Sequence, residues 1–342
     1  MRVGKECEAG DRYLDSLSRS ERRRSGVVYT PPHLVQFILD EAGYLPKKAL
    51  QNVTLLDPAC GAGAFLAAAL ERLAASLAEQ GATVRSKQGR AELERLVRAN
   101  LAGVDVDREA CRLARRALTD RFETLTGARP SRGAFTRNVL CGDFLERNGA
   151  VRARVENAFD LIVGNPPYVT TTRLSNGQKA RFRERYECAH GRIDLYQLFV
   201  EQTIRDLPPG GRLAFITPNK FLTSQSGKML RSILLRSGAV NVIANFSSHR
   251  VFEGAATVPC VTVFEKGASP SVVQSMECGS KSTASGEESG VGTAFISGAD
   301  SIRWLFSSRQ TRGSALCPAA GRCSPSWLAA LRFTSVKHLP AA

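Results

Sequence analysis

A glycine-rich turn between an apolar strand and an alanine-rich helix limits what this chain can fold into. Residues 53–57 form a short apolar run, and the turn Asp57-Pro58-Ala59-Cys60-Gly61-Ala62-Gly63 follows it. A stretch rich in Ala and Leu then continues to about residue 80 and predicts a helix. Gly61 and Gly63 permit a tight turn and let a ligand approach the backbone closely. This strand–turn–helix unit is typical of an α/β fold with a parallel sheet.

The chemistry of this turn favours a cationic ligand over a phosphate. The free N–H groups at the start of the helix favour negative charge. A phosphate-binding loop, however, places a lysine and a serine or threonine after its glycines, and neither follows Gly63. A carboxylate at Asp57, at the end of the strand, suits an ammonium group.

Two further predicted strands end in acidic residues. The strand at 101–106 contains Asp105, and an acidic residue at this position of such a fold commonly binds the two hydroxyls of a ribose. The spacing from the glycines exceeds the usual ~20 residues, which we attribute to an inserted helix at 91–99. The strand at 139–144 ends in Asp143 and Phe144, a carboxylate and a ring that suit an adenine. Each acid alone is typical of a helix cap or a solvated loop, but three strand-end acids in succession indicate a nucleoside site.

A fourth apolar run, at 159–163, leads into Asn165-Pro166-Pro167-Tyr168. Each proline fixes its own φ and extends the residue before it, so a stiff arm follows the strand at the edge where α/β sheets bind ligands. The Asn165 side-chain oxygen and the Pro166 carbonyl are two acceptors that suit a planar amino group, and the Tyr168 ring offers a flat surface for an aromatic base. The alternative interpretation is a proline-rich turn that closes the strand.

The remaining pattern predicts a doubly wound α/β domain. Thr30 precedes a helix at 32–42 and is expected to cap it, with contact to a ligand as the alternative. Further helices are predicted at 108–120, 193–207 and 226–237, and further strands at 211–217, 239–246 and 257–264. We therefore expect a polar leader at 1–25, a Rossmann-like domain with a mostly parallel seven-stranded sheet flanked by helices at 26–266, and a poorly structured tail at 267–342, where Ser and Gly are frequent and the alternation is lost.

A formal net charge of +15 and a sequence pI of about 9.8 indicate a polyanionic partner, most often nucleic acid. Basic side chains gather after the Asn-Pro-Pro-Tyr segment and are expected to contact DNA phosphates, with a solvated face as the alternative. They are Arg173, Lys179, Arg181, Arg183 and Arg185. The nine cysteines form no CxxC pair or Cys/His metal spacing, so neither a metal site nor a disulfide framework is predicted. Reduced thiols and the absence of a signal core or a membrane-length apolar run indicate a cytoplasmic protein.

Taken in order, these motifs resemble those of the gamma-class N6-adenine-specific DNA methyltransferases of restriction–modification systems. The resemblance covers residues 27–266 and includes Thr30-Pro31-Pro32, Asp57 to Gly63, the strand-end acids, Asn165 to Tyr168 and the segment at 210–222. It implies a class I S-adenosylmethionine-dependent methyltransferase fold. It also implies that this cofactor contacts Thr30, Asp57, Pro58, Ala59, Gly61, Gly63, Asp105, Asp143 and Phe144.

The resemblance further implies how the target base is held. An adenine is flipped out of double-stranded DNA, its amino group is held by Asn165 and Pro166, and its ring lies between Tyr168 and Phe252. Hydrogen bonds from the amino group to Asn165 and Pro166 would favour a pyramidal nitrogen and localise its lone pair for attack on a sulfonium methyl group, without a metal. Because such enzymes usually carry a target-recognition domain, residues 267–342 would be its remnant, or specificity would come from a partner subunit. The alternatives are a protein-glutamine or ribosomal-RNA methyltransferase and a catalytically silent DNA-binding remnant.

Overall fold

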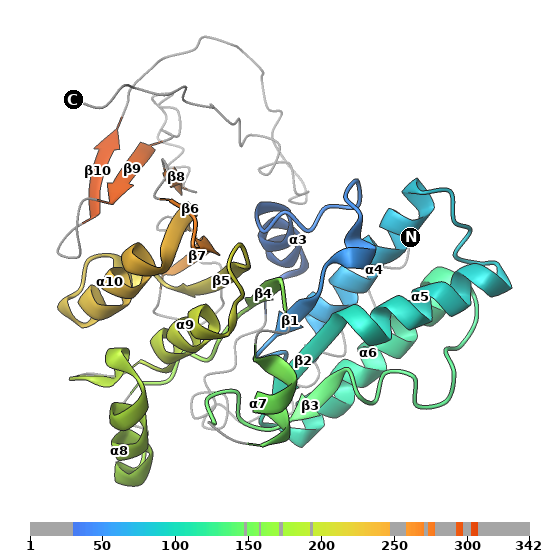
Figure 1. Ribbon diagram of the computed structural model, residues 1–342, viewed down its shortest axis with the longest axis horizontal. Coiled ribbons are helices and arrows are strands. Elements are labelled where there is room, and N and C mark those ends of the chain that lie inside the picture. The colour runs from blue at the N-terminus through green and yellow to red at the C-terminus, as the bar shows by residue number, and fades with distance from the viewer. Residues whose placement is uncertain are drawn as a thin grey trace, which may run out of the picture. The chain divides into compact units, whose positions relative to one another are not determined.

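The computed structural model describes residues 30–146, 149–156, 159–170, 174–191, 194–246 and 258–269, together with short strands at 273–277, 292–296 and 302–306. Within this part of the chain the strands form one continuous sheet (Figure 1). Its first seven strands are β1 Leu55–Asp57, β2 Leu101–Asp105, β3 Val139–Cys141, β4 Leu161–Gly164, β5 Arg212–Pro218, β6 Gly238–Asn245 and β7 Pro259–Lys266.

The order of these seven strands is β3-β2-β1-β4-β5-β7-β6. All neighbours from β3 to β5 pair in parallel, and β7 alone runs against both of its neighbours, β5 and β6. The chain therefore starts in the middle of the sheet, builds outward to β3, and returns to the other side of β1 with β4. This confirms the predicted mostly parallel, doubly wound sheet.

Three short strands lengthen the sheet beyond β6. They are β8 Val273–Glu277, parallel to β6, and β9 Gly292–Ile296 and β10 Ile302–Phe306, which pair antiparallel to each other. The sequence predicted no regular structure after residue 266, so these strands are a finding of the structure. The run at 273–277 contains only two apolar residues, Val273 and Met276, and it pairs through its backbone with β6, which lies earlier in the chain. Sequence patterns that consider only neighbouring residues do not detect pairing of this kind.

Helices cover both faces of the sheet. Their bounds are α3 Pro32–Glu41, α4 Ala64–Glu79, α5 Lys87–Asn100, α6 Arg108–Thr126, α7 Ala150–Val155, α8 Asn176–Arg185, α9 Leu195–Asp206 and α10 Lys228–Ser237. Short 3-10 helices lie at Leu50–Asn52, Glu187–Ala189, Asn219–Leu222 and Gln225–Gly227. Helix α4 packs on α3, α5 and α6, whereas α9 packs on α10 (Figure 1).

Every described residue of β1 and β4 is buried, as expected for strands covered on both sides. On one face, Leu56, Ile162 and Phe215 belong to a core shared with Phe199 of α9 and Leu230 of α10. Full burial of each such side chain contributes about 1.5–3 kcal/mol. The two helical layers therefore hold the central strands rigidly and fix where their carboxyl ends lie.

Four helices depart from the prediction. Helix α5 begins at Lys87, earlier than the predicted residue 91, and α8 was not predicted as a helix. Helix α6 continues to Thr126, beyond the predicted end at residue 120, because Phe122 and Thr126 are buried and Gly127 ends the helix with φ near 74°. Helix α7 was not predicted, since its six residues are too few for a helical period to show.

Candidate functional site

The site lies where the carboxyl ends of the parallel strands meet. The register pairs Asp57 of β1 with Gly103 of β2, and Asp105 of β2 with Cys141 of β3. The loop that contains Asp143 follows β3 directly. The sheet therefore gathers the three predicted acids at one edge, because parallel strands end on the same side.

The glycine turn is tied to the second acid. The Gly61 N–H donates to one carboxylate oxygen of Asp105 at 2.9 Å, and the Asp107 N–H donates to the other at 2.9 Å. Gly63 precedes α4 with φ near 90°, and a Cβ there would lie 2.9 Å from the Ala114 Cα in α6. Only glycine accepts this conformation at such close range.

The space above the turn is open. A Cβ built on Gly61 meets no atom of the described residues within 4 Å, so this part of the chain leaves the turn before α4 uncovered. Next to it, the Val106 side chain is 67% exposed. Among the bulky apolar residues of the described part, only Met229 is also exposed, at 37%. Val106 was not among the predicted site residues. In the sequence it stands out only as an apolar residue between Asp105, which ends β2, and Asp107, the N-cap of α6.

The three acids share one electrostatic feature. Burial raises the pKa of Asp57 to about 8, an effect that the Ala59 N–H partly offsets. Burial also raises the pKa of Asp105 and of Asp143. Buried carboxyl groups at one edge favour a ligand that brings positive charge and hydroxyl groups able to donate hydrogen bonds. The three acids therefore fit the ammonium and ribose groups of S-adenosylmethionine.

The Asn-Pro-Pro-Tyr segment follows β4 at the same edge. A Cβ on Gly164 would lie 2.7 Å from Asp57 Oδ1, so the residue before Asn165 touches the acid at the end of β1. Asn165 Nδ2 donates to Thr30 Oγ1 at 3.1 Å, across 135 residues of sequence. The amide nitrogen thus faces Thr30 and its oxygen faces the opposite way.

Thr30 does not have the role that was expected from sequence. The N-cap of α3 is Pro31, and no side chain caps the helix. The prediction of a Thr30 cap is wrong, because Thr30 lies one residue before the N-cap and its buried hydroxyl accepts a hydrogen bond from Asn165 instead. This contact joins the segment at 30–32 to the segment at 165–168.

Tyr168 is partly buried, with its hydroxyl donating to the Ile216 carbonyl at 3.3 Å. Burial raises the pKa of this phenol, so it remains neutral. Pro166 is buried and Pro167 is partly buried. The hydroxyl anchors Tyr168 to β5, and the ring keeps some exposure, as stacking on a base requires. Phe252, its expected counterpart, lies outside the described residues.

Phe144 lies deeper than the prediction implied. Its ring is 1% exposed, stacks on Phe199 with centroids 5.4 Å apart, and has the Arg152 guanidinium 5.5 Å from its centroid. In this structure its partners are protein groups, and its contact with a cofactor ring stays a prediction.

The basic residues after the Asn-Pro-Pro-Tyr segment lie mostly on α8. Ser175 and Gln178 form a capping box at its start, and Phe182 is its buried residue. Arg181 and Arg183 are exposed, and Lys179 and Arg185 are partly exposed. Arg181 and Arg185 lie 3.5 and 3.9 Å from the Glu146 carboxylate. Arg173 lies outside the described residues.

Within the described part of the chain, no group of three or more His, Cys, Asp or Glu side chains could hold a metal ion. The five cysteines described there are free thiols. None of the described helices has the length and hydropathy that crossing a bilayer requires.

Comparison with known proteins agrees with this geometry. Residues 99–252 match the family model described as Eco57I restriction-modification methylase. The chain contains an Eco57I-type restriction-modification methylase domain. The Type II methyltransferase M.BstVI of Geobacillus stearothermophilus is 31% identical over 76% of this chain and 46% of its own length. For M.XhoI of Xanthomonas vasicola the identity is 29%, over 70% of this chain and 42% of the relative. The chain thus spans less than half of each of these relatives.

The methylase domain also shares its fold with proteins of known structure. A solved complex of DrdV with DNA superposes with a TM-score of 0.62 at 18% identity, over 80% of this chain and 30% of that one. The strand order, with its single reversed strand β7 among the first seven, is that of a doubly wound, Rossmann-like sheet. The predicted fold is therefore confirmed.

Proposed function

We propose that this chain transfers a methyl group from S-adenosylmethionine to the N6 amino group of an adenine flipped out of double-stranded DNA, within a restriction–modification system. The observation that carries the proposal is the contact between two segments that are distant in sequence. Asn165 bonds Thr30, and its neighbour Gly164 lies against Asp57. The amide that would hold the amino group is thus fixed beside the carboxyl group that would hold the cofactor.

The cofactor supplies an electrophilic methyl group on a sulfonium sulfur. Asp57 suits the ammonium of its methionine part, and Thr30 lies at the same end. Asp105 would accept the ribose hydroxyls, and the exposed Val106 side chain would cover one face of the adenine. Asp143 would accept the adenine amino group. The open space above Gly61 lets the ligand lie along the backbone of the turn.

Asn165 and Pro166 would activate the amino group of the target base. An exocyclic amine is a weak nucleophile because its lone pair is delocalised into the ring. Two fixed acceptors that bind both of its protons favour a pyramidal nitrogen and localise that lone pair. Since Thr30 and the prolines hold these acceptors in advance, catalysis would depend on positioning and electrostatics. Tyr168, anchored through Ile216, would support the ring of the flipped base.

Helix α8 would bind DNA phosphates through Arg183 and Lys179. Replacing both with alanine should weaken DNA binding about tenfold at moderate salt and reduce the slope of log K against log salt by about 2, since each neutralised phosphate contributes ~0.9. Fluorescence anisotropy with a labelled duplex at several salt concentrations measures both quantities. Arg112→Ala, an exposed change on α6 where Arg112 pairs with Glu109, is the matched control. Equal slopes for all proteins would exclude α8 as a DNA contact.

Labelled methyl transfer tests the proposed reaction. The purified chain is incubated with methyl-labelled cofactor and, in parallel, with unmethylated DNA, RNA and a protein extract. DNA is then digested to nucleosides. Label in N6-methyladenine supports the proposal. Label in N4-methylcytosine keeps the enzyme class but changes the base, and label only in RNA or protein refutes DNA as the substrate. Cofactor binding without any transfer would identify a silent remnant.

A further inference from the structure

The loop after β3 contains Asp143. It is held by Arg185 at the end of helix α8 and by the next residue, Tyr186, as well as by its own strand. Within the loop, the Leu145 N–H donates to Asp143 Oδ1 at 2.9 Å, and the Glu146 N–H donates to the Asp143 carbonyl at 3.2 Å. The direction of the Asp143 carboxylate therefore depends on where the peptide groups of Leu145 and Glu146 lie.

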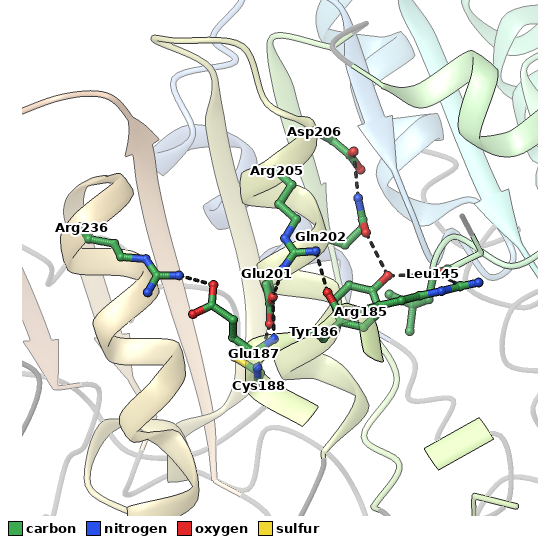
Figure 2. A network of polar contacts seen from close by, with 10 residues as sticks. All are labelled: Leu145, Arg185, Tyr186, Glu187, Cys188, Glu201, Gln202, Arg205, Asp206 and Arg236. Carbon is green, nitrogen blue, oxygen red and sulfur yellow. Dashed lines mark hydrogen bonds and ion pairs between the residues drawn. The ribbon is translucent and has the colours of Figure 1, made fainter. Parts of the chain in front are cut away.

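Leu145 is anchored by the residues that end α8. Its carbonyl accepts from the Tyr186 hydroxyl at 3.1 Å and from Arg185 Nη1 at 3.3 Å (Figure 2). Tyr186 is 2% exposed, and burial raises the pKa of its phenol, so the hydroxyl keeps its proton. A buried carbonyl that lost this donor would keep only the longer contact with Arg185, which costs free energy.

A series of contacts through Gln202, Asp206 and Arg152 connects the Tyr186 hydroxyl to a second residue of the loop, Phe144. Gln202 Oε1 also accepts from the Tyr186 hydroxyl, at 2.9 Å, so it competes with the Leu145 carbonyl for the single phenol proton. Gln202 Nε2 donates to Asp206 at 2.9 Å. Asp206 accepts from Arg152 at 2.6 Å, and the Arg152 guanidinium lies over the ring of Phe144. Figure 2 shows the part of this path from Leu145 to Asp206. The network thus contacts the loop both at Leu145 and at Phe144.

A second set of contacts fixes Tyr186 itself. The Arg205 guanidinium lies 5.4 Å from the centroid of the Tyr186 ring and donates to the Arg185 carbonyl at 2.8 Å. Glu201, 1% exposed, accepts the N–H groups of Glu187 and Cys188 at 2.9 Å each and pairs with Arg205. Helix α9 therefore holds the backbone on both sides of Tyr186, so the hydroxyl is a preorganised donor.

We propose that Tyr186 is a positioning residue for the cofactor, whose hydroxyl, by donating to the Leu145 carbonyl, sets the loop that presents Asp143 to the cofactor's adenine. The inference rests on the proposed function, because it assumes that Asp143 binds that adenine. Tyr186 touches neither ligand in this assignment and acts only through the Leu145 peptide. Its removal should therefore affect cofactor affinity and leave the transfer step unchanged.

The test compares Tyr186→Phe with Tyr44→Phe. Tyr44 is likewise buried, at 1% exposed, and its hydroxyl has no hydrogen-bond partner among the described residues, so its loss controls for removing a buried phenol hydroxyl. Calorimetry with S-adenosylhomocysteine should show a Kd about five- to tenfold higher for Tyr186→Phe, the fold-change expected for one net hydrogen bond. Tyr44→Phe should bind as the parent does. With saturating cofactor, kcat of Tyr186→Phe should stay within about twofold of the parent.

Gln202→Met provides a second variant if Tyr186→Phe does not fold. It removes the competing acceptor, so the hydroxyl donates to the Leu145 carbonyl alone and S-adenosylhomocysteine should bind at least as tightly as to the parent. If the parent binds this ligand and Tyr186→Phe binds it equally well, or Gln202→Met binds it more weakly, the inference is overturned while the proposed function stands. A lower Tm with unchanged Kd, or a loss confined to kcat, overturns it as well. If the parent chain itself binds no S-adenosylhomocysteine, the proposed function fails and the inference fails with it.

Discussion

Asn165→Ala should reduce methyl transfer to DNA about 10²–10³-fold, the loss typical of removing one fixed polar group that acts on the transition state. The variant retains Pro166 but loses the side-chain acceptor for the amino group. The fold should persist, since Asn165 is only partly buried and lies after β4. Single-turnover assays with saturating cofactor and DNA measure the transfer step directly.

Thr30→Val is the matched comparison for this result. Thr30 Oγ1 accepts from Asn165 Nδ2 in the structure, and valine keeps the shape of the side chain while removing the oxygen. The amide then loses one anchor but keeps its acceptor, so a smaller loss of about tenfold is expected. Calorimetry with S-adenosylhomocysteine should show unchanged affinity for Asn165→Ala. Unchanged transfer by Asn165→Ala would refute the assigned role.

Asp57→Asn should abolish the pH dependence of cofactor binding. Burial raises the pKa of Asp57 to about 8, so below that pH most molecules carry a neutral carboxyl group that attracts an ammonium weakly. The α-amino group of the ligand, with an ordinary pKa of ~7.7–8.0, stays protonated from pH 6 to 7. The parent should therefore bind S-adenosylhomocysteine about tenfold more tightly at pH 7 than at pH 6. Asp57→Asn should bind weakly at both.

The same carboxyl group should affect stability in the opposite direction. Its pKa is raised on folding from an ordinary value near 3.8, so the folded state holds the proton more tightly and loses stability as pH rises from about 4 to 8. Without ligand, the Tm of Asp57→Asn relative to the parent should increase across this range. Asp120→Asn, a surface change on α6, is the control and should follow the parent. A difference in Tm between Asp57→Asn and the parent that does not change with pH would show that Asp57 is ionised throughout this pH range.

The elements that the sequence predicted well are those with strong local signals. The strand before Asp57, the glycine turn and the helix after it follow from an apolar run, two glycines and an alanine-rich period, and the structure places them within two residues of the predicted bounds at most. Asn165-Pro166-Pro167-Tyr168 was placed correctly after a buried strand because proline restricts the backbone regardless of tertiary context.

The parts that were missed depend on contacts distant in sequence. Thr30 had every local feature of a helix cap, and only the folded chain brings Asn165 to its hydroxyl. Phe144 follows an acid that faces the site, but its ring packs on Phe199 from a helix much later in the chain. Tyr186 and Gln202 belong to no recognisable motif. Their relation to the loop after β3 arises from how α9 packs, which single-sequence patterns do not contain.

The strand order has a consequence for synthesis on the ribosome. Strand β1 pairs with β2 on one side and with β4 on the other, so one of its edges stays unpaired until residues 161–164 have been translated. At typical elongation rates of about 5–20 residues per second, the nascent chain exposes this apolar edge for about 5 to 20 s. Such an edge is a site for wrong pairing with other chains. Arrival of β4 both closes that vulnerable edge and brings Asn165 to Thr30, so assembly of the proposed site and protection of the nascent polypeptide coincide.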